Sequence, residues 1–126
     1  SELHRQARAD LLRGRYSQAI SGFDEVYKKD PTGARAPEAL FGLAQAHLAS
    51  GLLEDALKLF QRVAQEFPGS ASAPAALLKA GQTLNGLGRR DEASQILSTL
   101  VARYPESEEA RLAQFSASRK QAVESP

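Results

Sequence analysis

The feature that most constrains this chain is an internal repeat of 37 residues. Pro31, Pro68 and Pro105 are each 37 residues apart. The same interval relates two further sets of residues, Gly14, Gly51 and Gly88, and Ala19, Ala56 and Ala93. A fixed interval of this length is typical of a chain built from stacked copies of one supersecondary unit. The sequence therefore predicts a repeat architecture, in which each unit is stabilised by its neighbours.

Each unit has the pattern of two helices joined by a short turn. In the second unit, apolar residues recur three and four positions apart from Leu40 to Leu48 and again from Leu53 to Ala64, with Ser50-Gly51 between them. Pro37 and Pro74 fall in the first turns of predicted helices, where proline is tolerated. The chain has 22 Ala and 17 Leu against 4 Val and 2 Ile, which favours helix over strand. We therefore predict an all-α chain of helical hairpins.

The predicted fold is an α-α superhelix, a single domain over residues 1–126, with three hairpins and a C-terminal capping helix. The repeats are predicted at about 1–31, 32–68 and 69–105, and the capping helix at about 107–122. The predicted helices cover about 2–13, 16–29, 35–50, 53–66, 71–86, 90–103 and 107–122. Gly81 lies inside a predicted helix and indicates a close helix contact, whereas the sequence does not explain Gly22 or Gly42.

The second half of each unit resembles the tetratricopeptide repeat, in which Ala-x3-Phe is followed eight residues later by Pro. The matching segments are Ala19-x3-Phe23 with Pro31, Ala56-x3-Phe60 with Pro68, and Ala93-x3-Leu97 with Pro105. In this reading the small alanines allow two helices to cross closely. The phenylalanines fill the space between one hairpin and the next.

A closer resemblance is to the C-terminal domain of the periplasmic Tol-Pal protein family called YbgF or CpoB. It rests on the run from Pro68 to Gly81, on Gly88-Arg89-Arg90-Asp91-Glu92-Ala93 and on Tyr104-Pro105-Glu106-Ser107. The family usually has Tyr-Trp-Leu-Gly where this chain has Leu40-Phe41-Gly42-Leu43. The resemblance implies a periplasmic adaptor of the cell envelope that contacts TolA and links cell-wall synthesis to outer-membrane constriction during division. It also implies a trimer formed through an N-terminal coiled coil that is not part of this sequence.

The tetratricopeptide register predicts a binding groove, because first helices line the concave face in this repeat class. Phe41, Leu48, Leu78 and Phe115 would form an apolar strip edged by amide side chains, an arrangement typical of a protein-binding surface. The candidate groove residues are Arg8, Phe41, Gln45, Leu48, Leu78, Gln82, Asn85 and Phe115. His4, Leu11, Leu12 and Glu38 occupy further concave positions. The alternative is that these side chains pack against one another or against a terminal helix.

The residue types present do not indicate catalytic or metal chemistry. The chain has no Cys, and neither His4 nor His47 has a partner at metal-ligand spacing, so we expect structural or solvated roles for both. The acidic pairs Glu54-Asp55 and Asp91-Glu92 fall at predicted helix starts, where they suit the helix dipole. We therefore expect no enzyme activity, no catalytic residues, no metal and no cofactor.

Charge and hydropathy limit the partners. The formal net charge is +1, with both signs scattered, so nucleic acid is not an expected partner, and apolar runs of two to four residues predict no membrane insertion. The N-terminal arginines, Arg5, Arg8, Arg13 and Arg15, indicate a solvated face, with phosphate or anionic-lipid contact as the alternative. A chain without Met is expected to be a processed protein or an excised domain.

Two other functions stay open beside the Tol-Pal adaptor. One is a scaffold subunit of another bacterial envelope assembly, in outer-membrane biogenesis or in pilus or secretion machinery. The other is a structural oligomerisation module, which would associate with itself and bind no ligand in the groove. We expect the isolated domain to be monomeric, because the trimerising segment that the resemblance implies is not in this sequence.

Overall fold

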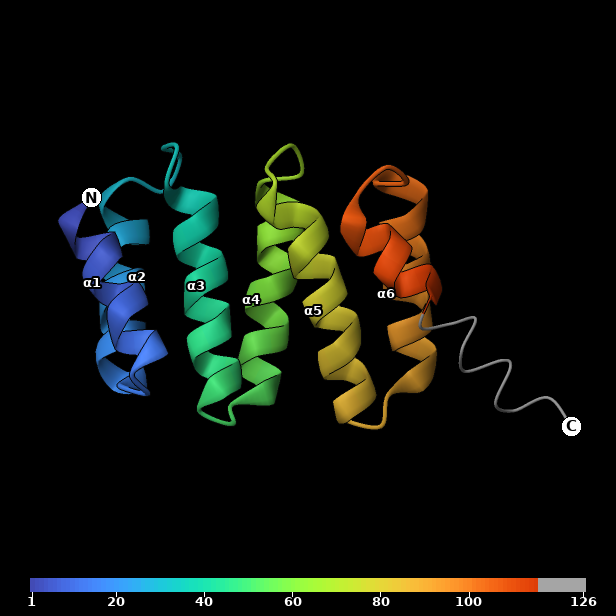
Figure 1. Ribbon diagram of the computed structural model, residues 1–126, viewed down its shortest axis with the longest axis horizontal. Helices are drawn as coiled ribbons and strands as arrows, with labels where there is room; N and C mark the ends of the chain where they lie inside the picture. Colours follow the sequence, from blue (N-terminus) through green and yellow to red (C-terminus); the bar gives the residue numbers. More distant parts are fainter. Residues whose placement is uncertain (116–126) are drawn as a thin grey trace, which may run out of the picture.

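The structure, a computed structural model, describes residues 1–115, which form a row of helical hairpins. The helices are α1 (Glu2–Leu12), α2 (Tyr16–Lys29), α3 (Ala36–Ala49), α4 (Leu53–Glu66), α5 (Ser72–Gly86) and α6 (Arg90–Arg103), and a further helical segment covers 108–115. Figure 1 shows the hairpins side by side, with α1 at one end of the row and the 108–115 segment at the other. The described residues contain no strand. The predicted all-α superhelix is confirmed.

The helix bounds differ from the predicted ones by one residue at most within the described part of the chain. The predicted capping helix begins at residue 108, one residue later than expected. Its expected continuation over 116–122 lies outside the described residues.

The repeated glycines end the first helix of each hairpin. Gly14, Gly51 and Gly88 have φ angles of 76°, 87° and 78°, a left-handed conformation that side chains disfavour. The residue after each glycine donates its N–H to a carbonyl five residues back, as from Arg15 to Asp10 at 2.8 Å. This is the hydrogen bond of the Schellman motif, which satisfies carbonyls left free at a helix end. The glycine interval in the sequence therefore reports a repeated turn geometry.

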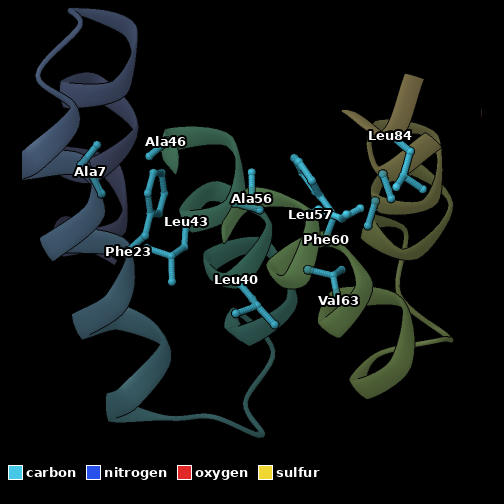
Figure 2. Packing of buried hydrophobic residues seen from close by; sticks show 14 of the residues in the cluster. Ala7, Phe23, Leu40, Leu43, Ala46, Ala56, Leu57, Phe60, Val63 and Leu84 are labelled. Carbon is cyan, nitrogen blue, oxygen red and sulfur yellow. The ribbon is translucent and has the colours of Figure 1, made fainter. Parts of the chain in front are cut away.

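The core is built from contacts between helices that are neighbours in the sequence. Each helix packs chiefly on the one before it and the one after it. The largest fully buried side chains come from all three hairpins: Phe23, Phe60, Leu40, Leu84, Leu100 and Val63. In Figure 2, Phe23 points from its own hairpin toward the next one. Nearest-neighbour burial of this kind supplies the stability of a solenoid.

Three glycines inside helices lie where a neighbouring side chain leaves no room for a methyl group. A Cβ atom at Gly42 would lie 2.5 Å from Cε1 of Phe23, and one at Gly22 would lie 2.8 Å from Cβ of Ala7. At Gly81 the added atom would lie 2.6 Å from Cδ2 of Leu97. The close contact predicted at Gly81 is confirmed. The structure also explains Gly22 and Gly42, which the sequence did not.

The effect of a methyl group is expected to differ between Gly42 and Gly86, the last residue of α5. Gly42→Ala should lower the free energy of unfolding by about 1–2 kcal/mol, because the clash with the Phe23 ring exceeds the gain in helix propensity. Gly86→Ala should raise it by about 0.4–1 kcal/mol, because a Cβ there has no atom of its surroundings within 4 Å. Urea unfolding followed by circular dichroism measures both. Equal or greater stability of Gly42→Ala would contradict the close packing.

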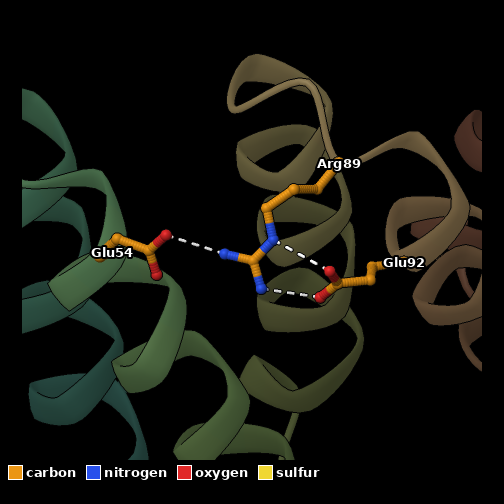
Figure 3. Close-up of polar contacts among 3 residues, drawn as sticks. All are labelled: Glu54, Arg89 and Glu92. Carbon is orange, nitrogen blue, oxygen red and sulfur yellow. Dashed lines mark hydrogen bonds and ion pairs between the residues drawn. The ribbon is translucent and has the colours of Figure 1, made fainter.

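Polar contacts join consecutive hairpins along the row. Arg89, before α6, donates to Glu92 in a two-point contact (Nε to Oε1 3.0 Å, Nη2 to Oε2 2.7 Å) and reaches Glu54 of α4 (2.8 Å), as Figure 3 shows. The guanidinium holds the pKa of the Glu92 carboxyl below its usual range. Both glutamates lie in first helical turns, as predicted for the acidic pairs. Since Arg89 and Glu92 belong to the third hairpin, the contact with Glu54 also joins this hairpin to the second.

A second polar contact fastens α2 to α4. The Tyr27 hydroxyl donates to Glu66 (2.6 Å), and Arg62 donates to Glu66 (2.8 Å) and to the Tyr27 oxygen (3.0 Å). These hydrogen bonds, first that from Arg62, lower the pKa of Glu66, while donation to Glu66 raises the pKa of Tyr27. Further along the row, the Tyr104 hydroxyl donates to the Pro68 carbonyl (2.6 Å). The spacing between hairpins is therefore held by polar as well as apolar contacts.

Candidate protein-binding groove

A cleft of about 310 Å³ lies between α1 and α3. Three of the candidate groove residues, Arg8, Phe41 and Gln45, line it together. The other lining residues are His4, Leu11, Leu12, Phe23, Glu38 and Gly42. Arg8 and Gln45 are 37 residues apart, so they hold the same position on successive first helices. The repeat itself thus brings these side chains together.

Two residues that line this cleft, His4 and Phe41, make edge-on aromatic contacts. The Phe41 ring lies edge-on to Phe60, with centroids 5.5 Å apart and planes at 61°. The His4 ring meets Phe23 in the same way, at 5.6 Å and 74°. Since His4 and Phe41 are 37 residues apart, and so are Phe23 and Phe60, one contact is made twice. Phe41 is half-buried, so part of its ring stays open to the cleft.

The remaining candidate residues lie outside this cleft, on α3, α5 and the 108–115 segment. Leu48 and Leu78 are half-buried and pack against core clusters, so part of each side chain is engaged in packing. Gln82 and Asn85 are exposed on α5. Phe115 is 61% exposed. Their part in binding stays a prediction.

Concave positions that stood outside the candidate set also shape the cleft. Leu12 is 86% exposed, the most exposed large hydrophobic residue of residues 1–115. Leu11 packs partly on the core, and Glu38 pairs with Arg35 at 3.1 Å. Phe23 lines the cleft as well, although its sequence motif indicated only a core role. Its side chain is nevertheless only 1% exposed, so Phe23 remains a core residue that borders the cleft.

His4 is the buried polar side chain of the cleft. It is only 5% exposed, its Nε2 lies 3.9 Å from Oε2 of Glu38, and its Nδ1 has no hydrogen-bond partner within residues 1–115. Burial lowers the pKa of His4 below 6.5, and the nearby Glu38 carboxylate partly opposes this shift. His4 is therefore mostly neutral at pH 7. An unsatisfied buried nitrogen destabilises the fold.

His4→Phe is expected to stabilise the chain by about 1 kcal/mol or more, because it removes the unpaired nitrogen and reproduces the ring contact of Phe41 with Phe60. The gain should be larger at acidic pH. Because the folded pKa of His4 lies below 6.5, the unfolded chain binds more protons between the two values, and the wild type loses stability as pH falls below about 6.5. Thermal unfolding at about pH 7.5 and about pH 5 measures the difference. Phe41→His, the reciprocal change, should be destabilising. An unchanged pH dependence in His4→Phe would contradict the assignment.

A larger hollow, of about 400 Å³, lies on the first hairpin at the N-terminal end of the row. It contains none of the candidate groove residues, and two of its polar side chains pair with each other, with Gln6 donating to Asp10 (3.2 Å). Gln6 stands where the next repeat has the buried Leu43. The polar replacement suits a face at the end of a solenoid.

No three His, Asp or Glu side chains of residues 1–115 are grouped so as to hold a metal ion. Across that part of the chain, no helix combines the length and the apolar character needed to cross a membrane.

Comparison with known families decides which repeat this is. Two family models described as "Tetratricopeptide repeat" match the chain, one over residues 4–71 and the other over residues 53–115. The chain belongs to the tetratricopeptide repeat family. The two matches together extend from α1 to the 108–115 segment.

A solved structure agrees with the tetratricopeptide fold. This chain is similar to a candidate kinesin light chain of Podosopora anserina with nearly identical TPR-like repeats, with 21% identity and a TM-score of 0.66. The match covers 80% of this chain and 52% of the other, so this chain spans about half of that protein's length. At this identity the likeness concerns the fold alone. No curated protein matches this chain.

Membership of the tetratricopeptide family indicates the general function. Tetratricopeptide domains bind protein partners, and their repeats are typically non-catalytic interaction scaffolds. The cleft between α1 and α3 is the part of the predicted groove that the first helices form together in this structure.

Proposed function

We propose that this chain is a non-enzymatic adaptor that binds a segment of a partner protein along its concave face. The observation that carries the proposal is the cleft between α1 and α3, where a half-open Phe41 and an 86% exposed Leu12 face a space of about 310 Å³. Exposed apolar side chains beside a cleft are unfavourable in water and become favourable when a partner covers them.

The apolar surface continues beyond this cleft at the repeat interval. Leu78 and Phe115 follow Phe41 at steps of 37 residues, on α5 and on the 108–115 segment. Gln45 and Gln82 follow the polar position one helical turn further along α3 and α5. An apolar strip with a polar edge is the composition of an interface core and its rim. A helix or an extended strand laid along the row would cover it.

The resemblance to the YbgF or CpoB family supports a specific setting for this adaptor. It supports a location in the bacterial periplasm, a role with the Tol-Pal system in coordinating cell division, and TolA as the partner. It also supports a trimer through an N-terminal coiled coil in the full-length protein, with the isolated domain monomeric. Recognition of a free C-terminal carboxylate is not proposed, because the basic and amide-rich set needed for it is not in the usual positions.

The groove is tested by the double variant Phe41→Glu with Leu78→Glu. Binding to the purified periplasmic part of TolA, measured by pull-down and calorimetry, should be lost, because two carboxylates would enter the apolar strip. The helical circular dichroism should persist, because both side chains are only half-buried. The control is Gln95→Glu with Ser98→Glu, which adds the same charges at exposed positions of α6 and should bind as the wild type does.

Other results would redirect the proposal. Retained binding in the Phe41→Glu, Leu78→Glu variant would move the site elsewhere on the molecule. Binding by a different envelope assembly, and not by TolA, would make the chain a scaffold subunit of that assembly. Self-association of the isolated chain, measured by light scattering, with no partner bound, would indicate a structural oligomerisation module.

A further inference from the structure

We infer that the segment bound in the cleft between α1 and α3 carries an acidic side chain beside an apolar one, and that Arg8 binds the acidic side chain. This inference rests on the proposed function, since it names the chemistry of the partner at the same groove.

The first observation is that Arg8 has no partner of its own. Arg5 lies 3.5 Å from Glu2, Arg15 lies 3.8 Å from Asp10, and Arg35 lies 3.1 Å from Glu38. Arg8 is exposed, lines the cleft and makes no ion pair or side-chain hydrogen bond with any of residues 1–115. A guanidinium cannot be deprotonated in a protein and has five donors, so it presents unused positive charge to whatever enters the cleft.

The second observation is that a further hydrogen-bond donor stands at the same repeat position. Gln45 is 37 residues after Arg8, on α3, and lines the same cleft. Arg8 and Gln45 therefore line one cleft from successive first helices, and both side chains have N–H donors from which a carboxylate can accept. Gln82 holds this position on α5. None of the three residues at this repeat position on α1, α3 and α5 carries a carboxylate.

Glu38, the one carboxylate among the lining residues, does not cancel the positive charge of Arg8 in the cleft. Glu38 is held by Arg35 at 3.1 Å, so this pair is neutral as a unit. His4 is mostly neutral at pH 7 because burial lowers its pKa. The positive charge of Arg8 is thus left over. A basic segment would be repelled at this point, and an acidic one would be attracted.

The third observation gives the apolar half of the motif. Leu11, Leu12 and Phe41 line the cleft with Arg8, and Leu12 is 86% exposed. A leucine or phenylalanine of the partner can pack there while a neighbouring aspartate or glutamate reaches Arg8. Protein interfaces usually have apolar anchors in pockets at their centre and polar or charged contacts around these anchors.

Three labelled synthetic peptides of about 15 residues test the inference against the full chain by fluorescence anisotropy. The first repeats Leu and Glu on one helical face, the second has Lys in place of every Glu, and the third has Ser in place of every Leu. We expect the Leu-Glu peptide to bind and the other two to bind at least about tenfold more weakly. Added salt should weaken binding of the Leu-Glu peptide, because it screens the contact with Arg8.

Variants of α1 identify the residue responsible. Arg8→Glu should weaken binding of the Leu-Glu peptide by about tenfold or more and strengthen binding of the Leu-Lys peptide. Arg8→Gln, which keeps helix propensity, should give a smaller loss and serves if the charge reversal affects folding. Arg13→Glu is the matched control, since Arg13 is exposed at the end of α1 and does not line the cleft.

The outcomes separate this inference from the proposed function. Equal binding of the Leu-Glu and Leu-Lys peptides, or equal effects of Arg8→Glu and Arg13→Glu, would overturn the inference. So would a dimer of the chain, detected by light scattering, that Arg8→Glu disrupts, because the occupant would then be a second copy. TolA binding that is lost in the Phe41→Glu, Leu78→Glu variant but kept in Arg8→Glu would overturn only the inference. Peptide binding without TolA binding would support the inference and leave TolA without support as the partner.

Discussion

Phe60→Ala is expected to lower the free energy of unfolding by about 3–5 kcal/mol, the range for emptying a buried aromatic site. Phe60 is fully buried in α4, with its ring against Phe41 and within the cluster that joins α3, α4 and α5. The same residue therefore contributes to the second hairpin and to its contact with the third. Because a solenoid is stabilised by nearest-neighbour contacts, loss of this ring should weaken the whole row.

Urea unfolding followed by circular dichroism and by Tyr fluorescence measures this effect. Leu12→Ala is the control, because Leu12 is 86% exposed and its truncation should change stability by about 0.5 kcal/mol or less. If the unfolding midpoint of Phe60→Ala equals that of Leu12→Ala, the stacking of hairpins through Phe60 is wrong.

The helices could be predicted closely because their signals are local and repeated. A glycine in left-handed conformation follows α1, α3 and α5, and a proline follows α2, α4 and α6. Each type of helix end therefore has the same sequence signal in all three repeats. Apolar spacing between those marks then fixes which face is buried. The repeat also carried the close contact at Gly81, since this residue holds the position of the small, fully buried Ala44 in the preceding unit.

Contacts that depend on how hairpins rotate against each other could not be predicted. Gly42 is small because the Phe23 ring of the preceding hairpin presses on it, and no local pattern shows that neighbour. Arg89 meets Glu54 across 35 residues, a contact that the residue types allow but do not specify. The sequence indicated only a helix-dipole role for the acidic pairs. The contact between Arg89 and Glu54 became evident only from the arrangement of the hairpins in the structure.

The candidate groove was predictable in its register but not in its depth. Position in the repeat assigned Arg8 and Gln45 to the predicted groove, and both line the cleft. Position in the repeat assigned Leu48 and Leu78 to the groove in the same way, but part of each side chain packs against the core. How far a side chain at one repeat position stands clear of the core depends on its length and on the residues beneath it. The position of a residue in the repeat does not determine either of these.

Truncation after Pro105 is expected to destabilise the chain and to make it self-associate. Ala110 and Ala113 of the 108–115 segment are buried against Leu77 and Leu100 of the third hairpin. Removing that segment exposes this apolar face, and exposing a single fully buried leucine costs about 1.5–3 kcal/mol. An uncovered end of a solenoid is also a surface on which another copy can stack. Thermal unfolding and light scattering over a range of concentrations measure the two effects.

A pair of point variants shows whether the covering contact itself is responsible. Ala113→Glu places a carboxylate at a position that is 4% exposed and should reproduce much of the destabilisation, because burial of an unpaired charge is costly. Gln114→Glu adds the same side chain at the neighbouring exposed position and should change stability little. The exposed Gln114 stands where the two preceding units have the buried Leu40 and Leu77, so the outer side of this helix carries a polar residue where a further repeat would need an apolar one. A monomeric truncated chain that unfolds at the temperature of the full chain would show that the segment does not cap the solenoid.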